Sequence, residues 1–190
     1  MKTLILETST EKSCLILSKG GKVVDALFLT GGPTLSKRLA LEVSLLLEKN
    51  SFLPQRIAVG QGPGSFTGIR VGAALAKALA FGWKIPLVGF CSLHAFAPAT
   101  EERFAVLFDA KMGGVYAWTP DNEAALLSIP EAETALRSMP LIASPHPALI
   151  QKRLSLPGTW LETSPDPSLL ARMAARGNPA PLKLDYLDLK

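Results

Sequence analysis

Residues 60–68 read GQGPGSFTG, and this segment stands between an apolar run at 56–60 and a run of helical periodicity at 67–82. Its four glycines indicate backbone conformations or close contacts that other residues do not tolerate. A further apolar run follows at 85–90. A strand, a helix and a strand in this order predict a βαβ unit, whose strands are parallel.

Further apolar runs lie on both sides of this unit, separated by turn residues. Upstream we expect an antiparallel meander of strands at 2–7, 13–18 and 22–29, and then a helix at 35–50. Downstream we expect a short helix at 92–97 and a second sheet that begins with strands at 103–109 and 115–118. From Pro120 onward, where ten of the 15 prolines lie, we expect only helices at 130–138 and 167–176 and a strand at 141–143.

The composition of the 190 residues, 48% hydrophobic and 19% charged, excludes a disordered or low-complexity chain. The net charge of +4 permits an acidic partner such as RNA, but the basic residues are dispersed. No apolar run reaches the ~20 residues of a membrane span, and the amino terminus lacks a signal sequence, so we expect a cytoplasmic protein without membrane contact. Cys14 and Cys91 are expected to be buried thiols.

The glycine-rich loop has two interpretations. The N–H groups at the start of a helix form a natural anion or nucleotide-phosphate site. The residues of that site would be Gly62, Gly64, Ser65, Thr67 and Gly68. Their spacing matches neither the Walker loop nor the GxGxxG fingerprint. A purely structural tight turn therefore stays equally open.

The two long helices carry apolar faces that are suited to close packing. In the first helix the apolar arc is wider than one core-facing stripe needs, and in the second, small residues recur at a spacing of four. Either the same chain or a second protein packs there, and in the second case a charge at Gly72 or Leu46 would disrupt association. The residues predicted for this partner interface are Leu35, Leu39, Val43, Leu46, Gly68, Gly72 and Ala76.

Residues suited to acid–base chemistry are sparse. His94 and His146 lie far apart in the sequence, and no local metal-binding motif is present. Glu7 and Asp109 each end a predicted strand, so they either face each other across a cleft or cap the following turns. We therefore predict no catalytic residue and no metal site.

Four motifs together resemble one family. They are Glu7-Thr8-Ser9, the segment GPGSFTGIRVG at 62–72, Ile85–Gly89 followed by Ser92-Leu93, and Asp109–Tyr116. The loop with its helix is highly specific, and residues 1–116 resemble the TsaB family, also called YeaZ. In the remainder, only Leu184–Leu187 is similar to the terminal strand of that family.

The resemblance implies the actin-like ATPase (ASKHA) architecture, an α/β fold of two related subdomains with mixed sheets. The first would span 1–100 and the second, shortened, 101–190. It also implies a non-catalytic partner and activator of TsaD, which threonylcarbamoylates an adenosine next to the tRNA anticodon with TsaE as an ATPase. In this family the first two helices, here 35–50 and 67–82, contact TsaD or form a homodimer. The resemblance implies that the chain has no cofactor of its own and that ATP or ADP binds only at the partner interface.

Some positions depart from the family pattern. Glu7 stands where the family usually has Asp, and Lys111 and Gly114 stand where it usually has Arg and Glu. Glu7-Thr8-Ser9 is also how TsaD sequences begin, although TsaD is longer and carries an HxxxH motif that is absent here. The alternative function is therefore a small ATP-dependent transferase or kinase-like enzyme that binds phosphate at 62–68 and Mg²⁺ at Asp109. A third alternative is direct, salt-sensitive RNA binding.

Overall fold

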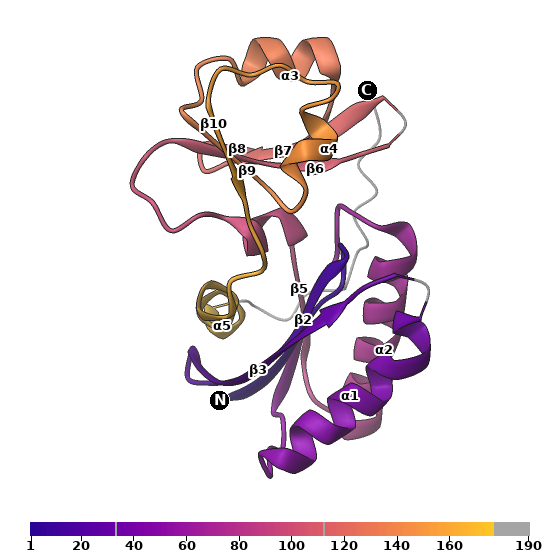
Figure 1. Ribbon diagram of the computed structural model, residues 1–190. Coiled ribbons are helices and arrows are strands. Elements are labelled where there is room, and N and C mark those ends of the chain that lie inside the picture. Colours follow the sequence, from indigo (N-terminus) through magenta and orange to yellow (C-terminus); the bar gives the residue numbers. More distant parts are fainter. Residues whose placement is uncertain (33, 112, 177–190) are drawn as a thin grey trace.

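The structure is a computed structural model that describes residues 1–32, 34–111 and 113–176. In this part of the chain, two mixed five-stranded sheets lie one above the other (Figure 1). The lower half contains β1 (Lys2–Glu7), β2 (Lys12–Lys19), β3 (Lys22–Thr30), α1 (Leu35–Lys49), β4 (Arg56–Gly60), α2 (Phe66–Trp83), β5 (Leu87–Phe90) and the 3-10 helix η1 (Ser92–Phe96). The upper half contains β6 (Phe104–Asp109), β7 (Gly114–Thr119), β8 (Asn122–Ser128), α3 (Ile129–Ala135), β9 (Leu141–Ser144), α4 (Pro147–Ile150) and β10 (Thr159–Glu162).

The two sheets have the same topology. The first has the strand order β3-β2-β1-β4-β5, and the second has the order β10-β9-β6-β7-β8. When β6 to β10 are matched in chain order to β1 to β5, the second order is the first one listed from the opposite edge. In each sheet the first strand pairs antiparallel with the second, and the second with the third. In each sheet the last two strands are parallel to the first. This repetition confirms the predicted α/β fold of two related units with mixed sheets.

Helices α1 and α2 cover one face of the first sheet. The apolar residues of α1 recur at helical spacing, so one stripe is buried against β1, β2 and β4. Full burial of one such leucine contributes about 1.5–3 kcal/mol. The opposite face of this sheet packs against η1, against α5 (Pro167–Arg176) and against one face of the second sheet. The outer face of the second sheet packs against α3 and α4, which completes the layers.

Helix α5 returns to the first sheet after the second sheet is complete (Figure 1). Leu170, Ala171 and Ala174 are buried there, and the Arg56 guanidinium donates a hydrogen bond to the Ala174 carbonyl at 2.8 Å. This helix lies in the range predicted for the second subdomain but packs on the first sheet. The boundary at residue 100 stays a prediction.

Most of the expected elements form, including the meander, the βαβ unit and both long helices. Three short elements were not predicted: β8, α4 and β10. Strand β8 has the sequence NEAALLS, whose alanines and leucines favour a helix, while the others are only four residues each. The family-like segment 184–187 lies outside the described residues. No helix in the described part of the chain is long and apolar enough to cross a membrane.

Candidate functional site

A cleft of about 390 Å³ lies between the two halves. Its walls come from the turn after β1, the start of α2, the turn after β6 and the start of α4. Ser9, Ser65, Asp109 and His146 are among the lining residues. The cleft therefore opens at the carboxyl ends of the first strand of each sheet, which is where α/β folds commonly bind ligands.

The glycine-rich loop contributes only part of its predicted anion site to this cleft. Gly64, Ser65 and Thr67 line it, whereas Gly62 and Gly68 do not. The Gly62 N–H donates to Ser92 Oγ at 3.2 Å, and the Gly68 N–H donates to Ser65 Oγ at 3.3 Å, which caps α2. These donors are already used by the protein, so fewer remain for an anion than the sequence suggested. The interpretation of the loop as a tight turn explains the φ angles of 104° at Gly62 and 146° at Gly64.

The small residues of α2 face the turn after β1 in the same chain. A Cβ atom on Gly68 would lie 2.1 Å from the Thr8 carbonyl oxygen, and one on Gly72 would lie 2.2 Å from Thr8 Oγ1. Thr8 Oγ1 donates to the Gly68 carbonyl at 2.8 Å, and Ala76 is fully buried. The close backbone approach predicted from the glycine spacing is therefore made by residue 8.

The residues predicted for the partner interface are mostly buried. Among these predicted residues, only Gly68 is partly exposed. A charge at Gly72 or Leu46 would therefore destabilise the fold itself, whether or not a partner binds. These positions hold the two helices against the rest of the chain, and partner contact through them stays a prediction. The buried residues are Leu35, Leu39, Val43, Leu46, Gly72 and Ala76. An interface on these two helices stays a prediction, and their outward residues would carry it.

The outward surfaces of α1 and α2 carry large apolar side chains. On α1, Leu41 and Leu45 are 60% and 51% exposed and lie one turn apart. On α2, Phe81 is 87% exposed, and Phe66 and Trp83 are exposed as well. Exposed apolar groups that gather on neighbouring helices are typical of contact surfaces.

Glu7 and Asp109 occupy matching positions at the ends of β1 and β6, but they do not face each other across the cleft. Glu7 is fully buried and does not line the cleft, and its Oε1 accepts the Ser9 N–H at 2.7 Å. Burial raises the pKa of Glu7, although hydrogen bonding from Ser9 and Ser92 acts in the opposite direction. Asp109 does line the cleft, where it pairs with Arg153 and accepts the Lys111 N–H at 2.9 Å. Both carboxylates therefore cap turns, which is the second of the two roles predicted for them.

The histidines and cysteines lie in four different settings. His94 packs against Trp118 in a tilted arrangement with 4.3 Å between ring centroids, and burial lowers the pKa of His94. His146 lines the cleft. Burial raises the pKa of the Cys14 thiol, as expected for a core residue, whereas Cys91 is only partly buried, contrary to prediction. Within the described ranges, no three His, Cys, Asp or Glu side chains gather as a metal site.

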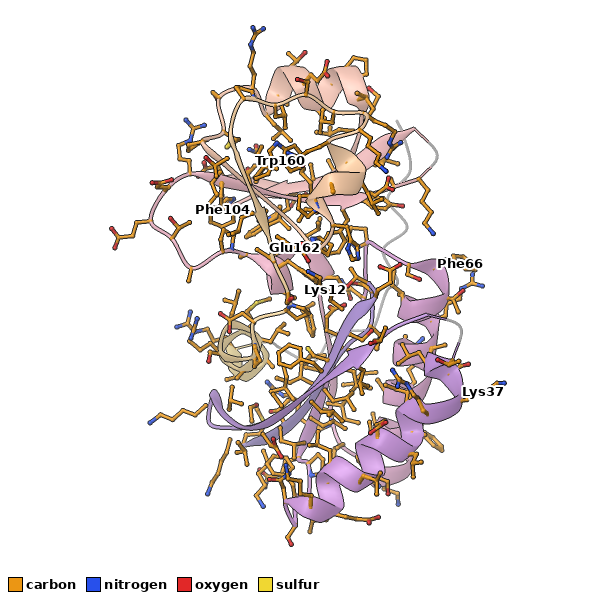
Figure 2. All side chains as sticks on the ribbon, in the orientation of Figure 1. Lys12, Lys37, Phe66, Phe104, Trp160 and Glu162 are labelled. Atoms are coloured by element: carbon orange, nitrogen blue, oxygen red, sulfur yellow. The ribbon has the colours of Figure 1, made fainter. Side chains whose placement is uncertain are left out.

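Polar bridges join the two halves beside the cleft. Lys12 Nζ lies 2.6 Å from Glu162 Oε1 and 3.1 Å from the Thr163 carbonyl, and Figure 2 shows Lys12 and Glu162 meeting between the halves. Glu11 Oε2 lies 3.0 Å from His146 Nε2. The partners are separated by at least 135 residues in sequence, so no local pattern could have predicted them.

A mixed sheet that occurs twice around a shared cleft defines a duplicated α/β protein of the actin-like class. The TsaD family model, tRNA N6-adenosine threonylcarbamoyltransferase, matches residues 35–142. The TsaB protein of Bacillus subtilis, a tRNA threonylcarbamoyladenosine biosynthesis protein, is 30% identical over 183 residues, which cover 81% of this chain and 80% of that protein. The protein of the same name in Escherichia coli is 28% identical over 85% of this chain and 70% of its own length. The chain belongs to the TsaB (YeaZ) family.

Solved structures agree with this fold. A Pseudomonas aeruginosa protein described as similar to the peptidase YEAZ superposes with a TM-score of 0.81. The match covers 98% of this chain and 99% of that one at 24% identity. A second structure, YeaZ from the same organism, gives a TM-score of 0.74 over 92% of this chain and 91% of that one, also at 24% identity. At this identity the likeness supports the fold and nothing finer.

Proposed function

We propose that this chain is a non-catalytic partner of a TsaD-like catalytic subunit in threonylcarbamoyladenosine modification of tRNA next to the anticodon. Two relatives that align with most of the chain are named for this biosynthesis, and the matching family model is that of the transferase. In the proposed heterodimer, α1 and α2 bind the catalytic subunit, and the chain activates it without performing chemistry.

The observation that carries the proposal is the apolar outer surface of α1 and α2. Leu41 and Leu45 project from one helix, and Phe81 projects from the other. Burying such side chains against a partner gains about 25 cal/mol for each Å² of apolar surface removed from water. Arg70 lies over the Phe66 ring at 3.6 Å, which adds a cation to the end of this surface nearest the cleft. Apolar anchors beside an arginine are typical of protein interfaces.

The remaining parts of the proposed assembly follow from the same role. A TsaE-like ATPase completes the complex, tRNA is contacted through the complex, and ATP or ADP binds at the partner interface. When the catalytic subunit is absent, the same helices form a homodimer. These partners place the chain in the cytoplasm.

Size-exclusion chromatography with the TsaD-like subunit of the same host tests the proposal. The unmodified chain is expected to co-elute with that subunit and to stimulate tRNA modification in a reconstituted reaction. Leu45→Glu is expected to abolish co-elution because it places a charge among the exposed apolar residues of α1. Leu161→Glu is the matched control, since this leucine on β10 is 41% exposed on the other half. Equal loss in both variants, or no complex with the unmodified chain, would contradict the proposal.

The cleft supports a second candidate function, that of a small ATP-dependent transferase. Its volume of about 390 Å³ is within the range of small-molecule sites. Asp109, the residue predicted to hold Mg²⁺, already pairs with Arg153, so metal binding would have to break that pair. This candidate requires nucleotide binding by the isolated chain and turnover that is lost in Asp109→Asn. Calorimetric titration with ATP and Mg²⁺ that detects no binding would exclude it.

A further inference from the structure

The turn between β1 and β2, taken together with the first residue of β2 as residues 8–12, contacts both halves of the molecule. Its first residues, Thr8 and Ser9, bind α2. Its last residues, Glu11 and Lys12, bind the second half. Among the cleft-lining segments, this turn thus connects the inward side of α2, one of the two helices proposed for partner binding, to the opposite wall of the cleft.

The contact with α2 leaves no free space. Thr8 and Ser9 are each 1% exposed, and the Ser65 N–H donates to the Ser9 carbonyl at 2.6 Å. A Cβ atom on Gly64 would lie 2.4 Å from the Ser9 carbonyl oxygen, and one on Gly72 would lie 2.2 Å from Thr8 Oγ1. The first turns of α2 therefore cannot shift without moving residues 8 and 9, because close-packed atoms transmit small displacements.

Hydrogen bonds stabilise the middle of the turn. Ser13 Oγ donates to the Thr10 carbonyl at 3.0 Å, and the Lys12 N–H donates to Thr10 Oγ1 at 3.1 Å. The Gly31 N–H donates to the Glu11 carbonyl at 2.7 Å, which ties the turn to the end of β3. These bonds hold residues 10–13 in one arrangement directly after Thr8 and Ser9, so movement at Thr8 would be passed on to Glu11 and Lys12.

The far end of the turn holds two separate segments of the second half. Glu11 binds His146 at the start of α4, and Lys12 binds Glu162 and the Thr163 carbonyl at the end of β10. His146 and Glu11 both line the cleft, so their bridge lies where the two halves would separate.

We propose that residues 8–12 form a coupling element that links the position of α2 to the closure of the cleft. Displacement of α2 loosens the bridges to the second half, and loss of the bridges loosens the first turn of α2. Coupling of this kind is reciprocal by thermodynamic linkage. If a partner docks on α1 and α2, the same element carries that event to the cleft; this extension alone rests on the proposed function.

Hydrogen exchange of the full-length chain, followed by mass spectrometry, tests the coupling without any partner. Gly72→Ala places a Cβ against Thr8 Oγ1 and is expected to accelerate exchange severalfold in two distant segments, 144–150 and 159–163. Exchange in α3, at 129–135, is expected to stay unchanged, since α3 lies on the far face of the second sheet.

Two matched variants separate coupling from general destabilisation. Gly82→Ala changes a glycine in the same helix that has no neighbour within 4 Å, and it is expected to leave exchange in the second half unaltered. Adding Thr8→Ala to Gly72→Ala removes Oγ1, after which the nearest remaining Thr8 atom, Cβ, lies 3.3 Å away. This double variant is expected to slow exchange at 144–150 again. Faster exchange confined to α2 and its loop in Gly72→Ala would overturn the proposal.

The reverse experiment covers the case in which Gly72→Ala does not fold. The combination His146→Gln and Glu162→Gln replaces one partner of each bridge at exposed or half-buried positions. Exchange is then expected to rise in residues 65–70, at the start of α2, although neither substitution touches that helix. An unchanged rate there would overturn the coupling. Failure of partner binding would leave both results intact, so the two proposals fail independently.

Discussion

The two halves of the molecule share one sheet topology but differ in their helices. The first sheet is covered by α1 and α2, with 15 and 18 residues, whereas the second carries α3 and α4, with seven and four. The long helices of the first half have both a buried stripe and exposed apolar residues on the outside. The repeated sheet therefore acts as a common frame, and the first half has added the helical surface on which the proposed partner binding depends.

The same comparison separates the two carboxylates that end β1 and β6. Glu7 is enclosed by the first half, where Gly60 at the end of β4 leaves room for it. The last residue of β9 is Ser144, whose hydroxyl accepts the His146 N–H at 3.1 Å. Asp109 in the second half remains at the cleft and is neutralised by Arg153. One position thus carries a core group in the first half and a surface ion pair in the second.

Gly60→Ala is expected to have the largest effect of the substitutions that test this difference. Its Cβ would lie 2.1 Å from Glu7 Oε2 and 2.7 Å from Ser92 Oγ. Overpacking of this kind costs about 1–3 kcal/mol, because the enclosed carboxylate has little room to move. Urea denaturation measures the loss.

A shorter acid supplies the control for this substitution. Glu7→Asp in the Gly60→Ala background withdraws the carboxylate by one methylene and is expected to recover part of the lost stability. Ser144→Gly, at the end of β9 in the second half, removes a hydrogen bond worth about 1 kcal/mol and is expected to cost less. An equal loss at Gly60 and Ser144 would show that the two strand ends are not different in packing.

Glu7→Gln is expected to change how stability depends on pH. Burial raises the folded-state pKa of Glu7 above its usual value of 4.5, so its protonated form favours folding. That contribution is complete below pH 4.5 and is lost as the pH rises through the raised value. The unmodified chain should therefore lose stability relative to Glu7→Gln as the pH rises through this window. Parallel stability curves from urea titrations between pH 4 and 8 would refute this assignment.

Many of the strands and helices could be predicted from the sequence, because the signals for them are local. The apolar runs at 2–7 and 56–60 and the glycine-rich loop predicted strands and the joint between them. The leucines of α1 predicted a helix but not which leucines face the core, since the apolar arc is wider than one stripe. Leu46 is buried and Leu45 is exposed, and that distinction depends on where the sheet lies.

The cleft could not be predicted in the same detail. Its bridges join residues such as Lys12 and Glu162, and pairing over that separation depends on how the two sheets stack. The burial of Glu7 likewise depends on Gly60 and Ser92 from two other elements. The turn that joins β1 to β2 gave a local signal for its existence but none for the partners at its two ends.

Asp109→Asn is expected to have a smaller effect than either substitution in the first half. The asparagine keeps an oxygen that accepts the Lys111 N–H but loses the charge that pairs with Arg153. Partly exposed ion pairs contribute about 0.2–1 kcal/mol, and salt screens them. The difference from the unmodified chain should therefore shrink in 1 M sodium chloride. A difference in stability that persists in high salt would contradict the description of Asp109 as part of a partly exposed ion pair.

The smallest expected effect belongs to Glu11→Gln, which removes one bridge between the halves. Burial alone would raise the pKa of Glu11, but a backbone hydrogen bond and the nearby His146 and Lys111 lower it overall. A lowered carboxyl pKa adds stability above the unfolded value of 4.5 and loses it as the pH falls through the folded value. Lys12 and Glu162 form the adjacent bridge and remain in this variant. Because the Glu11 side chain is largely exposed, the expected loss at pH 6 is about 0.2–1 kcal/mol, and it should be smaller in the His146→Gln background. A double-mutant cycle at pH 6 that finds additive losses for Glu11→Gln and His146→Gln would show that this bridge does not hold the halves together.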